Sequence, residues 1–161
     1  MRIIGIDPGL NVTGFGVVEV VEDRCSHVAH GVLRTKAGES LAERLTVIRD
    51  GVRAAVAEWG AVQGAIEASF VGNNARSAMA LGHARAAAIL GMADGGLTVH
   101  EYSPALVKQT VAGYGRGEKS QVAEMVRLQL SLAAVPTPAD ASDALAVAIT
   151  HWAHTRLAAL R

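Results

Sequence analysis

The N-terminal stretch, residues 1–16, constrains the fold of this chain more than any other segment. An apolar run, residues 3–6, ends on a single carboxylate, Asp7, and a Pro-Gly pair follows at once. Proline cannot donate to a central ladder and glycine permits a turn, so the strand must end near Asp7. A second apolar segment, residues 15–21, begins after a turn rich in Gly, Asn and Thr, and the two segments predict a β-hairpin.

Asp7 is thereby placed at the tip of a buried strand, beside a turn rich in backbone N–H groups. This placement suits a carboxylate that binds a metal ion near a phosphate. An aspartate at such a point can also simply cap the turn. From the N-terminal stretch alone both interpretations stay open, because short motifs also match by chance.

The composition bounds the class of protein. With 161 residues, 50% of them hydrophobic, the chain can bury a substantial core, and we expect a single domain spanning residues 1–161. Lys plus Arg and Asp plus Glu balance at 15 each, which argues against a generally basic nucleic-acid-binding surface but not against a local basic groove. The single cysteine, Cys25, excludes an internal disulfide framework. Without a signal-peptide pattern or an apolar run of membrane length, we expect a soluble, cytoplasmic protein that does not associate with membranes.

Hydrophobic periodicity and capping residues predict the remaining elements. A third strand is expected at residues 27–33. The pattern Ser40-Leu41-Ala42-Glu43 is a capping box that opens a helix, and Gly60 is placed to end it. Later segments predict a strand at 61–67, a helix rich in small residues from about 74 to 92, a strand at 97–102, a helix at 105–111 after Ser103-Pro104, a helix at 119–132 and a last helix at 138–157.

The resulting order, β-β-β-α-β-α-β-α-α-α, predicts an α/β fold. Three antiparallel strands followed by β-α units imply a mixed five-stranded sheet with helices on both faces. The sequence contains no internal repeat and no low-complexity tract that would suggest another architecture.

Four acidic residues occur where burial is otherwise expected. Asp7 and Glu67 each end an apolar strand, while Asp140 and Asp143 lie three residues apart in the first turns of the last helix and share one face. Taken alone, that pair is typical of the ordinary acids of a helix N-terminus. Adjacent strands, however, would place Asp7 and Glu67 at one edge of the sheet, and the last helix could bring the other two acids there.

Four carboxylates in such proximity cannot all stay ionised without cations. Carboxylate oxygens with few His or Cys residues nearby select Mg²⁺ or Mn²⁺. Two such ions about 4 Å apart form the clamp used for in-line phosphodiester hydrolysis. The sequence therefore favours a two-metal site built on these four acids.

Five motifs extend this pattern over nearly the whole chain: Gly5-Ile6-Asp7-Pro8-Gly9, Ile66-Glu67 with Phe70, Lys108-Gln109-Thr110-Val111, Glu118-Lys119-Ser120-Gln121-Val122 and Asp140-Ala141-Ser142-Asp143-Ala144-Leu145-Ala146. In residues, order and spacing they closely resemble the RuvC family of bacterial Holliday-junction resolvases. The joint match is more specific than any single motif.

The resemblance implies an RNase H-like fold, a symmetric homodimer and Mg²⁺-dependent cleavage of four-way DNA junctions in recombination and repair. It implies two Mg²⁺ ions per active site, with Mn²⁺ as a substitute, and work alongside the RuvA–RuvB branch-migration complex. It makes Asp7, Glu67, Asp140 and Asp143 the metal-binding acids, although some relatives have His at the position of Asp140. Lys108 and Lys119 match family positions near the scissile phosphate; without the resemblance, both would be read as solvated lysines.

Several further groups could hold DNA. Phe70, in a polar loop after Glu67, is a candidate to stack on an unpaired base, or else a staple that packs on the next helix. Contacts with backbone phosphates are expected from Asn73, Asn74, Arg76, Tyr114 and Arg116. The histidines are expected to be core or surface residues rather than metal ligands, with His151, two turns beyond Asp143 on the same helix face, as the exception to follow.

Residues 74–92 are too rich in Ala and Gly to fill a deep core alone, and small faces let another backbone approach closely. We therefore predict part of a twofold interface at Ala78, Leu81, Gly82, Arg85, Ala86 and Ile89. Close packing against the helix's own sheet is the alternative. Ala86 and Ala87 are expected to be exposed positions where a glutamate would break the dimer without unfolding the monomer.

Two other functions stay open. The opening motif with Thr13-Gly14 also resembles the phosphate loop of actin-like ATPases and sugar kinases, which need two such domains and a second phosphate loop that this sequence does not show. A non-catalytic junction-binding module on the same fold would not need four intact acids.

Overall fold

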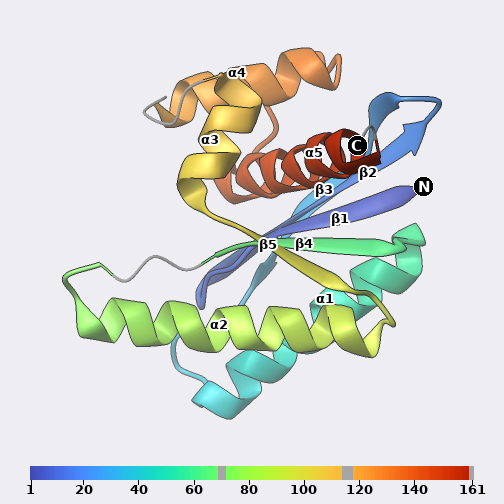
Figure 1. Ribbon diagram of the computed structural model, residues 1–161. Coiled ribbons are helices and arrows are strands. Elements are labelled where there is room, and N and C mark those ends of the chain that lie inside the picture. Colours follow the sequence, from blue (N-terminus) through green and yellow to red (C-terminus); the bar gives the residue numbers. More distant parts are fainter. Residues whose placement is uncertain (69–71, 114–117, 160–161) are drawn as a thin grey trace.

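The computed structural model describes residues 1–68, 72–113 and 118–159 (Figure 1). Its elements follow the predicted order: β1 Arg2–Asp7, β2 Val12–Val21, β3 Arg24–Arg34, α1 Leu41–Trp59, β4 Gln63–Glu67, α2 Ala75–Asp94, β5 Val99–Tyr102, α3 Pro104–Ala112, α4 Lys119–Gln129 and α5 Ala139–Ala159. None of the described helices is both long and apolar enough to cross a membrane.

The strands form one mixed sheet with the order β3-β2-β1-β4-β5, which confirms the predicted sheet. β1 lies at the centre and pairs antiparallel with β2 and parallel with β4. β5 pairs parallel with β4 at one edge, and β3 pairs antiparallel with β2 at the other. The parallel partners β1, β4 and β5 therefore bring their carboxyl ends to the same edge of the sheet.

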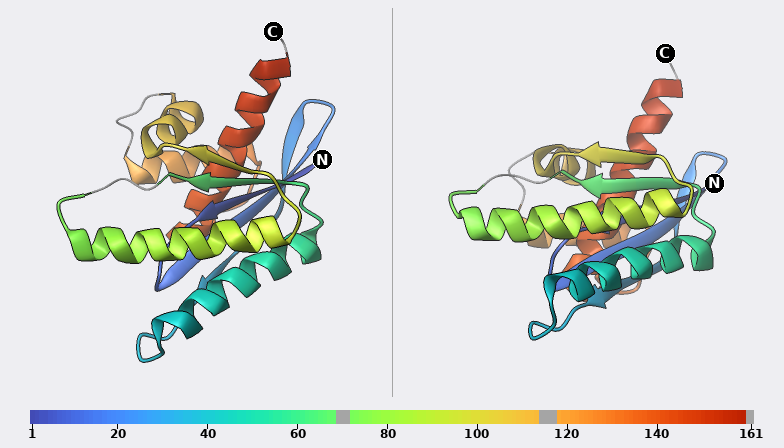
Figure 2. Two further views of the ribbon diagram at one scale, coloured as in Figure 1. Left: turned by 60° about the horizontal axis from the view of Figure 1, so that its bottom comes forward. Right: turned by 90° about the horizontal axis from the view of Figure 1, so that it is seen from below.

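Helices cover both faces of the sheet, with α1 and α2 on one face and α3, α4 and α5 on the other (Figures 1 and 2). Successive side chains of β1 point to opposite faces. Ile4 and Ile6 belong to the core under α1 and α2, whereas Ile3 belongs to the core under α5. By the same alternation Asp7 falls on the α5 face, where the last helix can supply further acids.

α5 lies almost on the backbone of the sheet because glycines leave room for it. A Cβ atom added to Gly5 would clash with the carbonyl oxygen of Ala144, and one added to Gly14 would clash with that of Asp140. Any side chain at these two positions would push the helix away from β1 and β2. The glycines thus set the distance between the first turns of α5 and the strand that carries Asp7.

Caps and turns account for most element boundaries. Ser40 and Glu43 form the predicted capping box, and Gly60 ends α1 with a φ of 61°. Asn74 caps α2 and Ser103 caps α3. The third strand begins earlier than predicted, at Arg24, and α4 ends earlier than predicted, at Gln129.

The early start of β3 has a local cause. Glu22 and Asp23 both have positive φ angles, of 44° and 67°, as a two-residue type I′ hairpin requires. The turn is therefore shorter than the polar composition suggested, and Val21 pairs directly with Arg24.

Candidate active site

Asp7 and Glu67 lie side by side at the carboxyl ends of β1 and β4. Ile6 pairs with Ile66 in the parallel ladder, so the acids that follow them occupy equivalent positions on neighbouring strands. The adjacency predicted from the sequence is thus confirmed. It follows from the sheet order, in which β1 and β4 are parallel neighbours.

The first turns of α5 bring Asp143 to the same place. A small pocket of about 190 Å³ is lined by Asp7, Glu67, Lys108, Lys119 and Asp143. Its remaining lining is apolar and comes from Pro104, Val107, Val122 and Ala146. Five of the six residues expected at the catalytic centre therefore converge, from β1, β4, α3, α4 and α5.

Asp140 does not line this pocket, but its carboxylate interacts electrostatically with two residues that do. It raises the pKa of the Asp7 carboxyl and also raises the pKa of Lys119. Asp140 stands one turn before Asp143 on α5, so it lies at the margin of the cluster rather than within it.

Lys119 contributes the one ion pair inside the pocket among the described residues. Its Nζ atom lies 2.9 Å from Oδ2 of Asp143. That hydrogen bond is the main cause of a raised pKa at Lys119. The ammonium group, whose side chain is 77% exposed, therefore provides the acid cluster with a cation from its solvent side.

The electrostatics of the pocket favour added positive charge. Burial, followed by the charges of Asp143, Glu67 and Asp140, raises the pKa of Asp7 to about 8, and Lys119 offsets only part of this effect. Burial and Asp143 also raise the pKa of Glu67, against the lowering effect of Lys119 and Lys108. Without a further cation, Asp7 would be largely protonated at neutral pH.

A divalent ion fits this donor chemistry. The available ligands are carboxylate oxygens, which suit Mg²⁺ and Mn²⁺. Nevertheless, among the residues that the structure describes, no three Asp, Glu, His or Cys side chains come close enough together to enclose an ion as they stand. Oδ2 of Asp143 is bound to Lys119, so a metal ion that used this oxygen would have to displace the lysine.

Thr13 supports the turn beside Asp7, a role different from the phosphate-loop position that the sequence motif suggested. Its side chain is fully buried, and its hydroxyl donates to the carbonyl oxygen of Gly9 at 2.7 Å and accepts from the Gly9 N–H at 3.3 Å. These bonds close the turn that follows Asp7. The Thr in a Gly/Asn/Thr-rich turn was the available signal, because such hydroxyls commonly bond nearby backbone groups.

The predicted DNA-binding residues divide into two groups. Phe70, Tyr114 and Arg116 lie outside the described residues, and so their positions relative to the acids stay predictions. Asn73, Asn74 and Arg76 are exposed at the start of α2. The Oδ1 atom of Asn74 accepts from the Ser77 N–H at 3.1 Å, which leaves its amide N–H₂ group for other contacts.

Exposed small and apolar residues form a stripe along α2. Met79 and Leu90 are 64% and 53% exposed, and Gly82 and Ala86 lie exposed between them at helical spacing. The other residues expected at a twofold interface, Ala78, Leu81, Arg85 and Ile89, are only partly exposed. Arg85 is also bound to Glu101 of β5 at 2.6 Å.

Ala87 corrects one expectation. It was expected to be an exposed position, but it is only 5% exposed and belongs to the core between α2 and the sheet. On a helix, residue 87 lies about 100° from residue 86, which turns it from the solvent to the core. A charge at Ala87 would therefore test folding rather than dimer formation.

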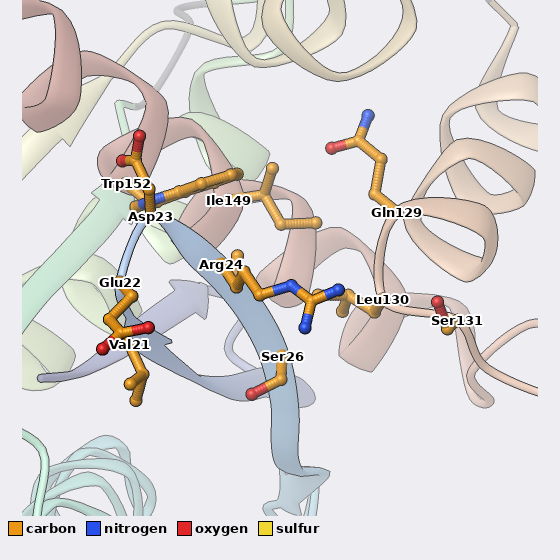
Figure 3. Close-up of a pocket in the computed structure, with 11 residues that line it drawn as sticks. Val21, Glu22, Asp23, Arg24, Ser26, Gln129, Leu130, Ser131, Ile149 and Trp152 are labelled. Carbon is orange, nitrogen blue, oxygen red and sulfur yellow. The ribbon is translucent and has the colours of Figure 1, made fainter.

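A larger cavity lies elsewhere, beside the hairpin turn at residues 21–24. It has a volume of about 820 Å³ and is floored by Leu130, Ile149 and Trp152. Figure 3 shows Arg24 extending toward Leu130 and Gln129 across this hollow. Asp23 at its rim pairs with Arg156 at 2.8 Å, and none of the strand-tip acids contributes to it. Size alone therefore does not mark the candidate active site.

A central strand with one antiparallel and one parallel neighbour, helices on both faces, and carboxylates at the strand tips and on the facing helix define the RNase H-like class of nucleases. The model of the family described as crossover junction endodeoxyribonuclease RuvC matches residues 3–151. The chain belongs to the RuvC family.

Individual relatives agree with this assignment. The crossover junction endodeoxyribonuclease RuvC of Burkholderia ambifaria is 52% identical over 151 residues, which make up 94% of this chain and 81% of that protein. Its counterpart in Paramagnetospirillum magneticum is 47% identical over 154 residues, 96% of this chain and 92% of that protein. The structure of Thermus thermophilus RuvC in complex with Holliday junction substrate is similar with a TM-score of 0.91, at 33% identity, over 98% of this chain and 96% of that one.

Proposed function

We propose that this chain is a structure-selective endodeoxyribonuclease that resolves four-way DNA junctions by paired, symmetric nicks in recombination and repair. The observation that carries the proposal is the convergence of Asp7, Glu67 and Asp143 with Lys119 in one pocket, in a chain of the RuvC family. T. thermophilus RuvC shares the fold over nearly the whole chain, and its structure is that of a complex with a Holliday junction substrate. A non-catalytic junction-binding module would have no use for such an acid cluster. We take residues 1–161 to be one nuclease domain, since a single sheet joins both cores.

Asp7, Glu67, Asp140 and Asp143 would hold divalent ions, which we propose to be two Mg²⁺ per active site, with Mn²⁺ as a substitute. When bound, the ions supply an activated water and a clamp on the attacking and leaving oxygens of phosphodiester hydrolysis. Support for a cation comes from the raised pKa of Asp7, which burial and the neighbouring acids cause. Asp7 is the acid whose charge is coupled to all three others, so we assign it the central ligand position.

Lys108 and Lys119 would hold the scissile phosphate. Both line the pocket, Lys108 from α3 and Lys119 from α4. An ammonium group there can bind a phosphate oxygen and stabilise the negative charge that develops during hydrolysis. An ion held by the Asp143 carboxylate would leave Lys119 free for this role.

Other groups would position the DNA rather than cut it. We propose that Asn73, Asn74 and Arg76 at the exposed start of α2, with Tyr114 and Arg116, contact backbone phosphates. Phe70 would stack on an unpaired base at the centre of the junction.

A symmetric homodimer would match the substrate. A four-way junction has nearly twofold symmetry, and its resolution needs one nick in each of two opposed strands. Two identical sites related by a twofold axis meet that need. We place part of the interface on the exposed α2 stripe of Met79, Gly82, Ala86 and Leu90. Family membership also supports partnership with the RuvA–RuvB complex and a cytoplasmic location.

The test uses a synthetic four-way junction labelled on each strand in turn, with Mg²⁺ or with a chelator. We expect paired nicks at symmetric positions in two opposed strands with Mg²⁺, and binding without cleavage in the chelator. A linear duplex of the same sequence serves as the control. Cleavage of the duplex as fast as the junction, or no cleavage of the junction at any Mg²⁺ or Mn²⁺ concentration, would contradict the proposal.

A further inference from the structure

His151 is a fully buried polar side chain with both ring nitrogens engaged. Its Nδ1 atom lies 2.8 Å from the hydroxyl oxygen of Tyr102, and its Nε2 atom lies 2.8 Å from Oε1 of Gln63. An amide oxygen can only accept, so Nε2 carries the hydrogen. Nδ1 of the neutral ring then accepts from the Tyr102 hydroxyl, and the direction of both bonds is fixed.

The surroundings of His151 keep the ring neutral. Burial, followed by the neighbouring His100 and His154, lowers the pKa of His151 to about 4. The ring of His100 lies 4.5 Å from that of His151, centre to centre. The tautomer required by Gln63 and Tyr102 is therefore maintained at neutral pH.

These two bonds connect elements that carry the acids. Gln63 is the first residue of β4, the strand that ends on Glu67. Tyr102 ends β5 and pairs in register with Glu67, and its carbonyl oxygen accepts from the Ala68 N–H at 2.7 Å. His151 follows Asp143 by eight residues on α5, about two helical turns. One imidazole thus joins the helix of Asp143 to the first residue of β4 and to Tyr102 of β5, the ladder partner of Glu67.

Apart from the Arg156–Asp23 ion pair at the β2–β3 turn, the remaining contacts between α5 and the sheet have little directional character. Near Gly5 the helix meets the sheet through Ala144 and Ala148, with backbone close to backbone. Leu145 and Ile149 add apolar packing, but hydrophobic burial is not directional. In the part of the chain that the structure describes, the two bonds of His151 are the side-chain hydrogen bonds that tie α5 to a strand.

We infer that His151, with Tyr102 and Gln63, is a positioning unit that fixes the rotation and axial position of α5 against β4, and so sets Asp143 against Asp7 and Glu67 for metal binding. This inference rests on the proposed metal-binding role of these acids. His151 itself touches neither the acids nor the pocket, so it acts through the helix.

The test compares Tyr102→Phe and His151→Leu with Thr150→Val. Thr150 is also fully buried on α5, but its hydroxyl bonds to the carbonyl oxygen of Ala146 within the same helix, at 2.8 Å. Its replacement therefore removes a buried hydrogen bond without releasing α5 from the sheet. Tyr102→Phe removes a single oxygen from a partly exposed edge strand, so it remains informative if His151→Leu does not fold.

Two measurements separate positioning from general stability. The first is Mn²⁺ binding to the DNA-free protein, followed by electron paramagnetic resonance, and the second is the Mg²⁺ concentration that gives half-maximal junction cleavage. We expect Tyr102→Phe, which loses one hydrogen bond, to weaken Mn²⁺ binding about 3- to 10-fold, and His151→Leu, which loses both, to weaken it at least as much. Both variants should raise the Mg²⁺ requirement in parallel. Junction binding in a chelator should stay within about 2-fold of wild type, since the phosphate contacts are elsewhere.

Thr150→Val sets the reference. If it weakens Mn²⁺ binding as much as Tyr102→Phe does, at a similar melting temperature, the histidine is an ordinary core residue and the inference is wrong. If the wild-type protein binds Mn²⁺ but cuts no junction, the proposed function fails, while the Mn²⁺ measurements still decide the role of His151.

Discussion

The Lys119 ammonium group and the Asp143 carboxylate, on α4 and α5, form an ion pair at 2.9 Å at the mouth of the acid pocket. The pair joins a residue expected to bind phosphate to a residue expected to bind metal. A divalent ion bound at the proposed site would compete with the lysine for this carboxylate. Lys119 would then have two separable roles, one toward the metal and one toward the DNA.

Lys119→Ala should strengthen metal binding to the DNA-free protein. Its removal leaves the charges of Asp143, Asp7 and Glu67 without their nearest cation, so an added ion gains more from neutralising them. We expect Mn²⁺ to bind up to about 5-fold more tightly, since an exposed ion pair is worth up to about 1 kcal/mol. Lys108→Ala is the matched comparison. If Lys119→Ala weakens Mn²⁺ binding, the competition does not exist.

The same variant should cut more slowly. Lys119→Ala removes a cation that can stabilise the phosphate during hydrolysis, and we expect single-turnover cleavage at saturating Mg²⁺ to fall roughly 10- to 100-fold. Lys108→Ala should behave similarly, because Lys108 lines the same pocket. Junction affinity at moderate salt should fall by less than about 3-fold in either variant. Normal cleavage rates in both would mean that these side chains are simply solvated.

Asp7→Asn should abolish cleavage and keep junction binding. The amide cannot provide the anionic oxygens that a divalent ion requires, while the groups that position DNA are untouched. Gel-shift titration in a chelator and cleavage in Mg²⁺ measure the two properties separately. Cutting by Asp7→Asn at a rate near that of wild type would remove Asp7 from the proposed metal site.

The metal-free protein should lose stability as the pH rises from about 4 to 8. In the folded state the pKa of Asp7 is raised from 3.8 to about 8, so within this range the folded protein binds a proton that the unfolded chain has released. Stability therefore falls with increasing pH across that window. The raised pKa of Glu67 acts in the same direction.

Thermal unfolding in a chelator, followed from pH 4.5 to 8, tests this pH dependence. Asp7→Asn should make the melting temperature nearly independent of pH. At pH 8 the variant should melt at least about 3 °C above wild type, the shift that ~1 kcal/mol gives in a chain of this length. Mg²⁺ should raise the melting temperature of the wild-type protein at pH 8 but have little effect on that of the variant. Identical pH profiles for the two metal-free proteins would show that Asp7 is not buried among like charges.

The fold was largely predictable because its elements are marked by local chemistry. Ser40 with Glu43, Gly60 and the Ser103-Pro104 pair each fixed a helix end that the structure confirms. The short turn at Glu22 and Asp23 was not predictable, because glutamate is not a usual choice at the first of two successive positive φ angles. How closely α5 approaches the sheet was not predictable either. It depends on which glycines face the helix, and that is known only once the register of β1 and β2 is known.

The site was predictable in its acids and less so in its contacts. Asp7 and Glu67 end strands that must pair, so their adjacency follows from topology. The Lys119–Asp143 ion pair joins residues 24 positions apart through a helix packing that no local pattern specifies. The His151 bonds to Tyr102 and Gln63 join residues 49 and 88 positions apart, and only the folded arrangement reveals them.

The exposed stripe on α2 leads to a prediction about assembly. Ala86 is exposed between Met79 and Leu90, whereas Ala87, the next residue, is buried in the core. A glutamate at Ala86 would meet solvent in a monomer but the partner's apolar surface in a dimer, where an unpaired charge is costly. A glutamate at Ala87 would be unfavourable in either state.

Ala86→Glu should therefore sediment as a folded monomer, with a melting temperature close to that of the wild-type protein. Ala87→Glu should unfold at a clearly lower temperature. Ala54→Glu, an exposed alanine on the neighbouring α1, is the matched control and should stay dimeric. The Ala86→Glu monomer should nick a junction in one strand at a time, if it cuts at all, because coordinated cleavage needs two sites related by the twofold axis. A wild-type protein that sediments as a monomer under cutting conditions and still nicks both strands together would refute the dimer, and an Ala86→Glu protein that stays dimeric would move the interface away from this stripe.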